Sequence, residues 1–119
     1  MKKQITKEQF IQSYRSANLW FVAVYMEAFL LSIDELREDV LKTRLIEEIY
    51  NNGQGSDKYE SGTRTRVNSL LRIIEAARVV EALEVAVHST RLRNDFPVAV
   101  DRAKDLLKRI ETGEFIIPE

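Results

Sequence analysis

Cysteine is missing from the sequence, and its absence excludes several kinds of chemistry. The chain has no disulfide framework, no thiolate metal site and no cysteine nucleophile. A protein without disulfides fits a reducing compartment, so we expect a cytoplasmic location. Histidine occurs once, at His88, and the Glu-x-x-His spacing of di-iron sites does not occur. We therefore predict neither a metal site nor a cofactor.

Glycine, proline and long apolar runs are also scarce, with four glycines and two prolines in 119 residues. No stretch alternates between apolar and polar residues for a useful length, so strands are not expected. The longest apolar run, 19–31, is shorter than the roughly 20 residues that a membrane span needs, and it contains Glu27. The basic start, 1–6, lacks the apolar core of a signal peptide. We predict a protein that does not insert into a membrane.

Helical signals dominate the first half of the chain. Thr6 with Gln9, and Ser32 with Glu35, have the spacing of a capping box, which predicts that a helix begins at each place. Apolar residues then recur at helical spacing after both starts. The Asn-Asn-Gly sequence at 51–53 predicts the end of the second helix, with the glycine in a left-handed conformation.

Two further helical runs occupy the second half. The third helix is predicted to begin within 57–65 and to continue to about residue 88. Its apolar face rotates beyond Arg78, which predicts either a bend near residue 78 or different neighbours on different sides of the helix. The last helix is predicted to have Pro97 in its first turn and to end before Gly113.

These elements predict an all-α fold. We expect a compact bundle of four main helices at about 6–31, 32–52, 60–89 and 96–112. A glycine-rich loop at 51–63 separates the second helix from the third, and a short tail covers 113–119. The length of 119 residues suits a single domain, so we assign 1–119 to one helical domain.

The run 19–31 is apolar on every side when it is drawn as a helix, which is typical of a helix that is covered all round. One interpretation is a central core helix. The other is that Val22, Met26 and Phe29 contact a second chain, because few other long helices are predicted to cover this one. Glu27 is expected to pair with an arginine of a neighbouring helix, since a half-buried charge is costly alone.

The tail offers a second candidate contact for a partner. Its apolar residues are Phe115, Ile116 and Ile117. They either meet another protein or pack over the end of the bundle.

The net charge of −1 conceals a block pattern. Residues 27–60 contain nine acidic and four basic residues, whereas residues 61–93 contain six basic and three acidic residues. All six basic residues of the second block are arginines. The arginine fork suits bidentate contact with phosphate or carboxylate, so this block is a candidate binding surface.

Two arginine pairs mark the ends of the predicted helix 60–89. A helix start adds free backbone N–H groups to the first pair, and a separation of about 37 Å suits an extended backbone better than one small anion. The candidate anion-binding or phosphate-binding residues are Thr63, Arg64, Thr65, Arg66, Arg72, Arg91 and Arg93. Alternatively, the arginines form salt bridges with the acidic residues of 32–52 or with an acidic protein partner. The acidic block could also meet the basic block of a second copy.

The sequence therefore predicts a non-enzymatic binding or assembly subunit that forms a homo-oligomer or docks into a larger complex. Its arginine-rich surface is expected to bind the phosphate backbone of nucleic acid, DNA or RNA, without reading sequence. The alternative is a purely protein–protein interaction module, an adaptor or inhibitor, whose arginines form salt bridges. A small hydrolase that uses Glu27 or His88 is a third alternative, for which the sequence shows no partner group.

Overall fold

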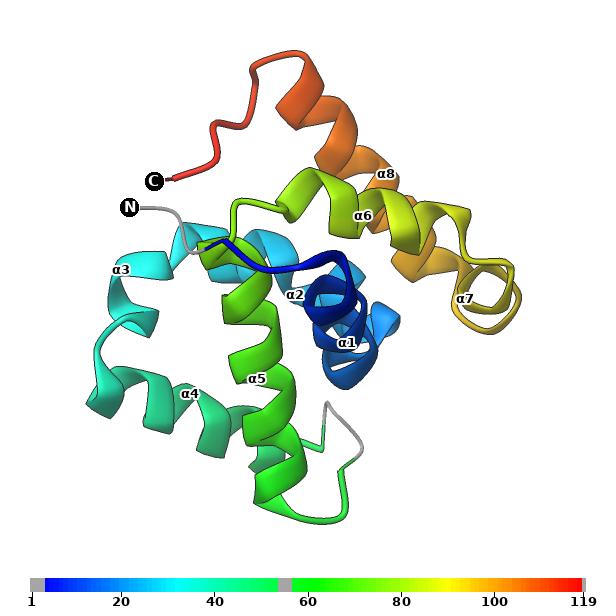
Figure 1. Cartoon of the computed structure of the whole chain (residues 1–119). Helices are drawn as coiled ribbons and strands as arrows, with labels where there is room; N and C mark the ends of the chain where they lie inside the picture. The colour runs from blue at the N-terminus through cyan, green and yellow to red at the C-terminus, as the bar shows by residue number, and fades with distance from the viewer. Residues whose placement is uncertain (1–3, 54–56, 119) are drawn as a thin grey trace.

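Regular structure is entirely helical over residues 4–53 and 57–118, which are the residues that the computed structural model describes (Figure 1). The helices are α1 (Lys7–Ala17), α2 (Leu19–Leu31), α3 (Ile33–Leu36), α4 (Asp39–Asn51), α5 (Glu60–Glu75), α6 (Val79–His88), α7 (Thr90–Asp95) and α8 (Pro97–Glu111). The all-α prediction is confirmed. The prediction of four main helices is too simple, because breaks divide the first three of them.

Asn18 divides the first predicted helix. Its φ of 75° is a left-handed value that asparagine tolerates better than most residues. Its N–H donates to the carbonyl of Arg15 at 3.2 Å, and its Oδ1 accepts from the N–H of Trp20 at 2.9 Å, so one residue ends α1 and caps α2. The capping box at the start of α1 is present as predicted, because the side chains of Thr6 and Gln9 each accept from the other's N–H.

The third predicted helix divides at residues 76–78, where the sequence indicated a bend. The N–H of Arg78 donates to the carbonyl of Ile73 at 3.1 Å, and that of Ala77 donates to Ile74 at 3.0 Å. These two hydrogen bonds form a Schellman motif, in which the residue with positive φ is usually glycine. Ala77 has a φ of 58°, a conformation that costs a non-glycine residue about 1 kcal/mol. Beyond this turn α6 leaves in a new direction and packs on α8 (Figure 1).

The second predicted helix divides into α3 and α4. Ser32 is the N-cap residue of α3, as predicted, but the capping box predicted for it does not form. The Ser32 side chain makes no capping hydrogen bond, and α3 is only four residues long. The predicted ends at Gly53 and Gly113 are confirmed, since both glycines have positive φ, 66° and 82°, just beyond α4 and α8. Pro97 stands in the first turn of α8, also as predicted.

The helices pack around α2, which contacts α1, α3, α5, α6 and α8. On one side of α2, α1 and α4 lie against α5, and on another side α8 packs on α6 and α7 (Figure 1). The radius of gyration of the Cα atoms is 13.5 Å. A compact chain of this length is expected to have a radius of about 13.5 Å, so the helices form a compact unit.

The inner side of α2 supplies the centre of the core. Its buried residues are Phe21, Val22, Ala23, Met26, Phe29 and Leu30. The ring of Phe21 stacks on Tyr25 at 4.5 Å and meets Phe29 edge-on at 5.8 Å. Of the two interpretations of 19–31, the structure therefore agrees with the central core helix. On its outer side Ala28 and Leu31 are exposed, Leu31 to 70%.

Candidate functional site

Arg66 lies inside the fold rather than on a free surface. Its Nε donates to both carboxylate oxygens of Asp57 at 3.0 Å, and its Nη1 donates to the carbonyl of Ala17 at 3.2 Å. The side chains of Arg66 and Asp57 are 23% and 10% exposed. Buried Thr63 donates its hydroxyl to Asp57 at 2.9 Å. These contacts tie the segment before α5 to the end of α1.

Gly62 leaves room for this group. A Cβ on Gly62 would lie 3.0 Å from Oδ1 of Asp57, closer than neighbouring atoms comfortably allow. The glycine inside the first turn of α5 therefore has a packing reason: it lets the Asp57 carboxylate approach the helix backbone.

The other polar candidates at the start of α5 have local partners. Arg64 pairs with Glu60 at 2.9 Å, and the hydroxyl of Thr65 donates to the carbonyl of Ser61 at 3.0 Å. Since α5 begins at Glu60, Arg64 and Arg66 lie beyond its first turn. The guanidinium groups of these two arginines meet Glu60 and Asp57 in this structure.

The second arginine pair lies on α7, separated from the start of α5 (Figure 1). The Arg91 side chain is 94% exposed and faces Asp95 at 3.9 Å, whereas Arg93 donates to the carbonyl of Val87 at 3.1 Å. Because the chain turns at residues 76–78, the two arginine pairs do not mark the ends of one helix, and the predicted span of about 37 Å along one axis is wrong. Exposed Arg72 has no ion-pair partner among the described residues.

The candidate interface residues of α2 are inside the molecule. Val22 and Met26 are 0% exposed, and Phe29 is 1% exposed. All three belong to the core cluster of this chain. They offer no surface to a second chain in this fold.

The tail turns back over the end of α8. The N–H of Phe115 donates to the carbonyl of Arg109 at 2.9 Å, and the Arg109 guanidinium lies 5.8 Å from the centre of the Phe115 ring. Ile117 packs against the core, while Ile116 is 83% exposed. The tail thus covers the end of the bundle and leaves one isoleucine on the surface.

Glu27 pairs with an arginine of a neighbouring helix, as predicted for a half-buried carboxylate. Arg109 of α8 donates to both of its oxygens, from Nη1 at 3.3 Å and from Nη2. The Nε of Arg109 donates to Asp105 at 2.9 Å. The hydrogen bond with Glu27 raises the pKa of Arg109, and desolvation opposes that shift. This network joins α2 to α8.

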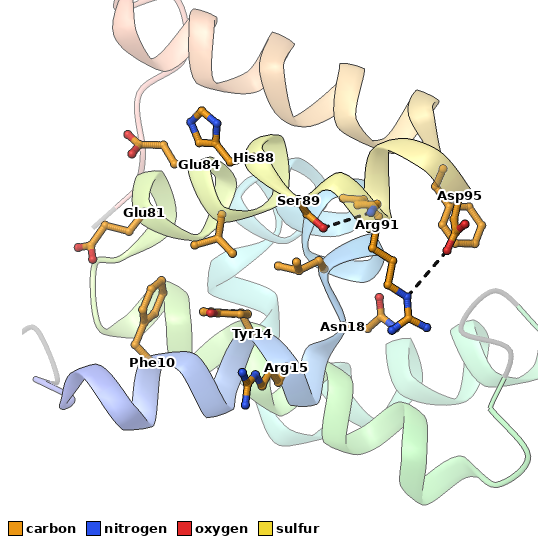
Figure 2. A pocket seen from close by; sticks show the side chains of 14 residues that line it. Phe10, Tyr14, Arg15, Asn18, Glu81, Glu84, His88, Ser89, Arg91 and Asp95 are labelled. Atoms are coloured by element: carbon orange, nitrogen blue, oxygen red, sulfur yellow. Dashed lines mark hydrogen bonds and ion pairs between the residues drawn. The ribbon is translucent and has the colours of Figure 1, made fainter.

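A groove of about 940 Å³ separates α1 from α6 and reaches α7 (Figure 2). We call it the α1–α6 groove. Its apolar lining comes from α1, α2, α6, α7 and the residue before α8, and comprises Phe10, Tyr14, Leu19, Val85, Leu92 and Phe96. Phe10 and Tyr14 lie one turn apart on α1 with ring centres 5.4 Å apart, so they form an aromatic wall.

Charged side chains of both signs border this groove. Glu81 and Glu84 stand on α6, with His88 in its last turn, whereas Arg15 stands on α1 and Arg91 on α7 (Figure 2). The groove therefore has acidic groups along α6, whereas α1 contributes the base Arg15 and α7 contributes both Arg91 and the acid Asp95, which face each other at 3.9 Å.

Several of these border charges have no ion-pair or hydrogen-bond partner among the residues that the structure describes. Glu81 pairs with Arg78 at 3.1 Å. Among the described residues, Arg15, Glu84 and His88 make no ion pair and no side-chain hydrogen bond. Unpaired charges beside an apolar surface are available to a binding partner.

The groove shows no nucleophile hydrogen-bonded to a base within the described part of the chain. Ser89 follows His88, but its Oγ accepts from the N–H of Leu92 at 3.1 Å and caps α7. No group of three histidine, aspartate or glutamate side chains in 4–53 and 57–118 could hold a metal ion.

Sequence reasoning missed this groove because it treated 6–31 as one straight helix. The break at Asn18 turns α2 away from α1 and leaves the side of Phe10 and Tyr14 facing α6. The signal that was available is Asn18 itself, a polar residue with αL tolerance directly before a long apolar run.

Comparison with known proteins identifies no matching family model, no matching curated protein and no matching solved structure. Within the described residues, no helix combines the length and the apolar character that crossing a membrane requires. A function for this chain therefore has to follow from its own geometry.

Proposed function

We propose that this protein is a non-enzymatic assembly subunit that binds an amphipathic helix of a partner protein in the α1–α6 groove. The observation that carries the proposal is the construction of the groove, an apolar floor between two helices with unpaired charges of both signs at its border. Such grooves receive the apolar face of a helix, while the flanking charges of that helix meet the border.

The apolar lining suits a helix better than a compact small ligand. Tyr14 of α1, Leu19 of α2 and Val85 of α6 are partly exposed and Phe96 is 50% exposed, so they offer apolar surface against which the ridges of another helix can pack. Phe10 is 6% exposed and belongs to the core cluster, so it supports Tyr14 and contributes little surface of its own. Leu92 and Phe96 extend the lining to α7 and the start of α8. The volume of about 940 Å³ is at the upper limit of the roughly 300–1,000 Å³ of small-molecule sites.

The contacts of the arginines also favour a protein partner over a phosphate backbone. Arg64 and Arg66 meet carboxylates of their own chain, and Arg93 meets a carbonyl. Nucleic-acid binding needs several cations that are free to neutralise phosphates. Titration with single-stranded and double-stranded DNA and RNA at two salt concentrations tests this preference. If DNA or RNA binds in a salt-dependent way, and this binding is lost when Arg91 and Arg93 are both changed to Ala, a nucleic-acid partner would be favoured over a protein partner.

The direct test of the groove uses three designed leucine-striped helical peptides. One has lysine along both edges of the stripe, one has glutamate along both edges, and one has lysine along one edge and glutamate along the other. We expect the mixed peptide to bind most tightly, because it meets Glu84 on one side and Arg15 on the other. Trp20, the only tryptophan, reports binding by fluorescence, since its ring lies 6.1 Å from that of Phe96 at the end of the groove.

Charge reversal at the border then changes the preference. Arg15→Glu makes both sides acidic, so the lysine-edged peptide should gain roughly two- to fivefold in affinity and the mixed peptide should lose as much. Glu84→Lys should favour the glutamate-edged peptide in the same way. Lys104→Glu, on exposed α8 surface outside the groove, is the matched control and should leave all three affinities unchanged. Equal binding of every peptide by every variant, or no saturable binding at all, would contradict the proposal.

A further inference from the structure

The outer side of α2 is apolar, although no other described part of the chain covers it. A shallow groove of about 500 Å³ runs along it between α2 and α8. Leu31 of α2 and Val98 of α8 are 70% and 71% exposed, and only Ile116 is more exposed among the large apolar side chains of the described residues. We call this surface the α2–α8 face; its exposed apolar residues are Ala28, Leu31 and Val98, and Val24, which is partly buried against the core, also lines it.

The polar border of the α2–α8 face has a paired part and an unpaired part. Glu27 and Asp105 are both held by Arg109. Asp101 and Arg102 are exposed neighbours on α8, and neither makes an ion pair or side-chain hydrogen bond with another described residue. One acid and one base that form no ion pair within the described residues therefore lie next to each other in sequence at the edge of an exposed apolar patch.

We infer that the α2–α8 face binds the same face of a second copy of this chain, as a two-fold symmetric dimer. In such an interface residue i of one copy meets residue j of the other, and symmetry repeats the contact. With the axis near α8, Arg102 of one copy lies against Asp101 of the other, twice. A partner with charge of one sign would bind best to a border of the opposite sign. The border of this face has an acid beside a base, so it is complementary to the same border of a second copy.

The dimensions of the face set the strength of the dimer. α2 has 13 residues and α8 has 15, so each is about 20 Å long, and packed helix axes lie about 8–10 Å apart. The two helices thus present a patch of roughly 20 by 20 Å, which is small beside the approximately 800 Å² that each partner buries in a standard interface. The dimer is accordingly weak and concentration-dependent. It uses a different face from the α1–α6 groove and does not depend on that proposal.

Sedimentation equilibrium of the full chain over a concentration series is the test. The wild-type protein should shift from monomer to dimer, and Leu31→Glu or Val98→Glu should keep it monomeric. Both side chains are about 70% exposed, so the variants should keep the helical circular dichroism of the wild type. Val40→Glu is the matched control, because Val40 is 66% exposed on α4, outside the face, and its dimerisation should match that of the wild type.

A charge swap tests the predicted pairing. Asp101→Arg alone and Arg102→Asp alone each place like charges opposite one another, and each should weaken self-association roughly fivefold or more, since two symmetric contacts are lost. An equimolar mixture of the two variants should associate more strongly than either alone, because each basic edge then meets an acidic edge. A monomer at all concentrations, a dimer that Leu31→Glu leaves intact, or a mixture that shows no recovery would overturn the inference. Peptide binding in the α1–α6 groove, measured on the same variants, should persist in every case, so the failure of one proposal is distinguishable from the failure of the other.

Discussion

Replacing Arg66 should destabilise the protein far more than replacing its neighbour Arg64. Arg66→Met removes three hydrogen bonds, two to Asp57 and one to Ala17. Among the described residues, the 10% exposed carboxylate of Asp57 then keeps the hydroxyl of Thr63 as a donor. Breaking a buried ion pair costs about 3–5 kcal/mol, and breaking an exposed one costs about 0–1 kcal/mol. With Arg66 itself 23% exposed, we expect a loss of about 2–3 kcal/mol. For a chain of this size that loss lowers the melting temperature by about 10 °C.

Arg64→Met is the matched control. Arg64 pairs with Glu60 one turn away on the same helix, and the two side chains are 43% and 41% exposed. Such a pair is worth about 0.2–0.5 kcal/mol, so this variant should stay close to the wild type. Urea denaturation followed by circular dichroism measures both, with unchanged slopes showing that the two variants unfold between the same states.

A double-mutant cycle with Asp57→Asn isolates the pair itself. We expect a coupling free energy of about 2 kcal/mol between Arg66 and Asp57, at the upper part of the range for contacting residues. A coupling free energy of zero, together with equal decreases in the free energy of unfolding for the Arg64 and Arg66 variants, would refute the structural role assigned to Arg66. It would also return Arg66 to the set of cations available to a phosphate ligand.

Two further predictions concern local strain and pH. Ala77→Gly should raise the free energy of unfolding by about 1 kcal/mol, because glycine adopts the φ of 58° without the Cβ clash, whereas Ala76→Gly, at a φ of −81°, should lower it; urea midpoints of the two variants measure the contrast. Burial raises the pKa of Tyr25 from its ordinary value of 10.0, against an opposing effect of Arg102, so the folded state holds that proton longer than the unfolded state. The contribution of Tyr25 to the free energy of unfolding should then be fully present below pH 10 and be lost as the pH rises through the folded pKa of Tyr25. Tyr25→Phe should remove this loss. A phenolate titration of the folded wild type should show one tyrosine that ionises at higher pH than the others, and the variant should lack it.

Local patterns predicted much of where the chain starts and stops its helices. The capping box of Thr6 and Gln9, the glycines at 53 and 113 and the proline at 97 each involve groups only a few residues apart. Their energies are therefore present whatever the rest of the chain does. The spacing of apolar residues likewise predicted the all-α class, because they recur at the helical period in most of the predicted helices and no stretch alternates between apolar and polar residues for a useful length.

For residues with distant partners, the sequence predicted the chemical type of the partner but did not identify the residue. The need of Glu27 for a cation followed from its apolar surroundings, but Arg109 lies 82 positions away. The same limit applied to Arg66, whose carbonyl partner at Ala17 is 49 residues distant. A free arginine and a buried one have the same side chain, so only the folded chain distinguishes a candidate ligand site from an internal ion pair.

The tertiary structure decided which side of α2 faces outward, and at Ala77 it decided between the two alternatives that the rotated apolar pattern had left open. At Ala77 the intrinsic preference of alanine favours a continued helix, and the turn is held by packing of α5 on α1 and of α6 on α8. Along α2 nearly every position is apolar, so no local free energy selects which side is buried. The neighbouring helices make that choice: they cover Val22, Met26 and Phe29, and they leave Leu31 and the α2–α8 face in contact with solvent.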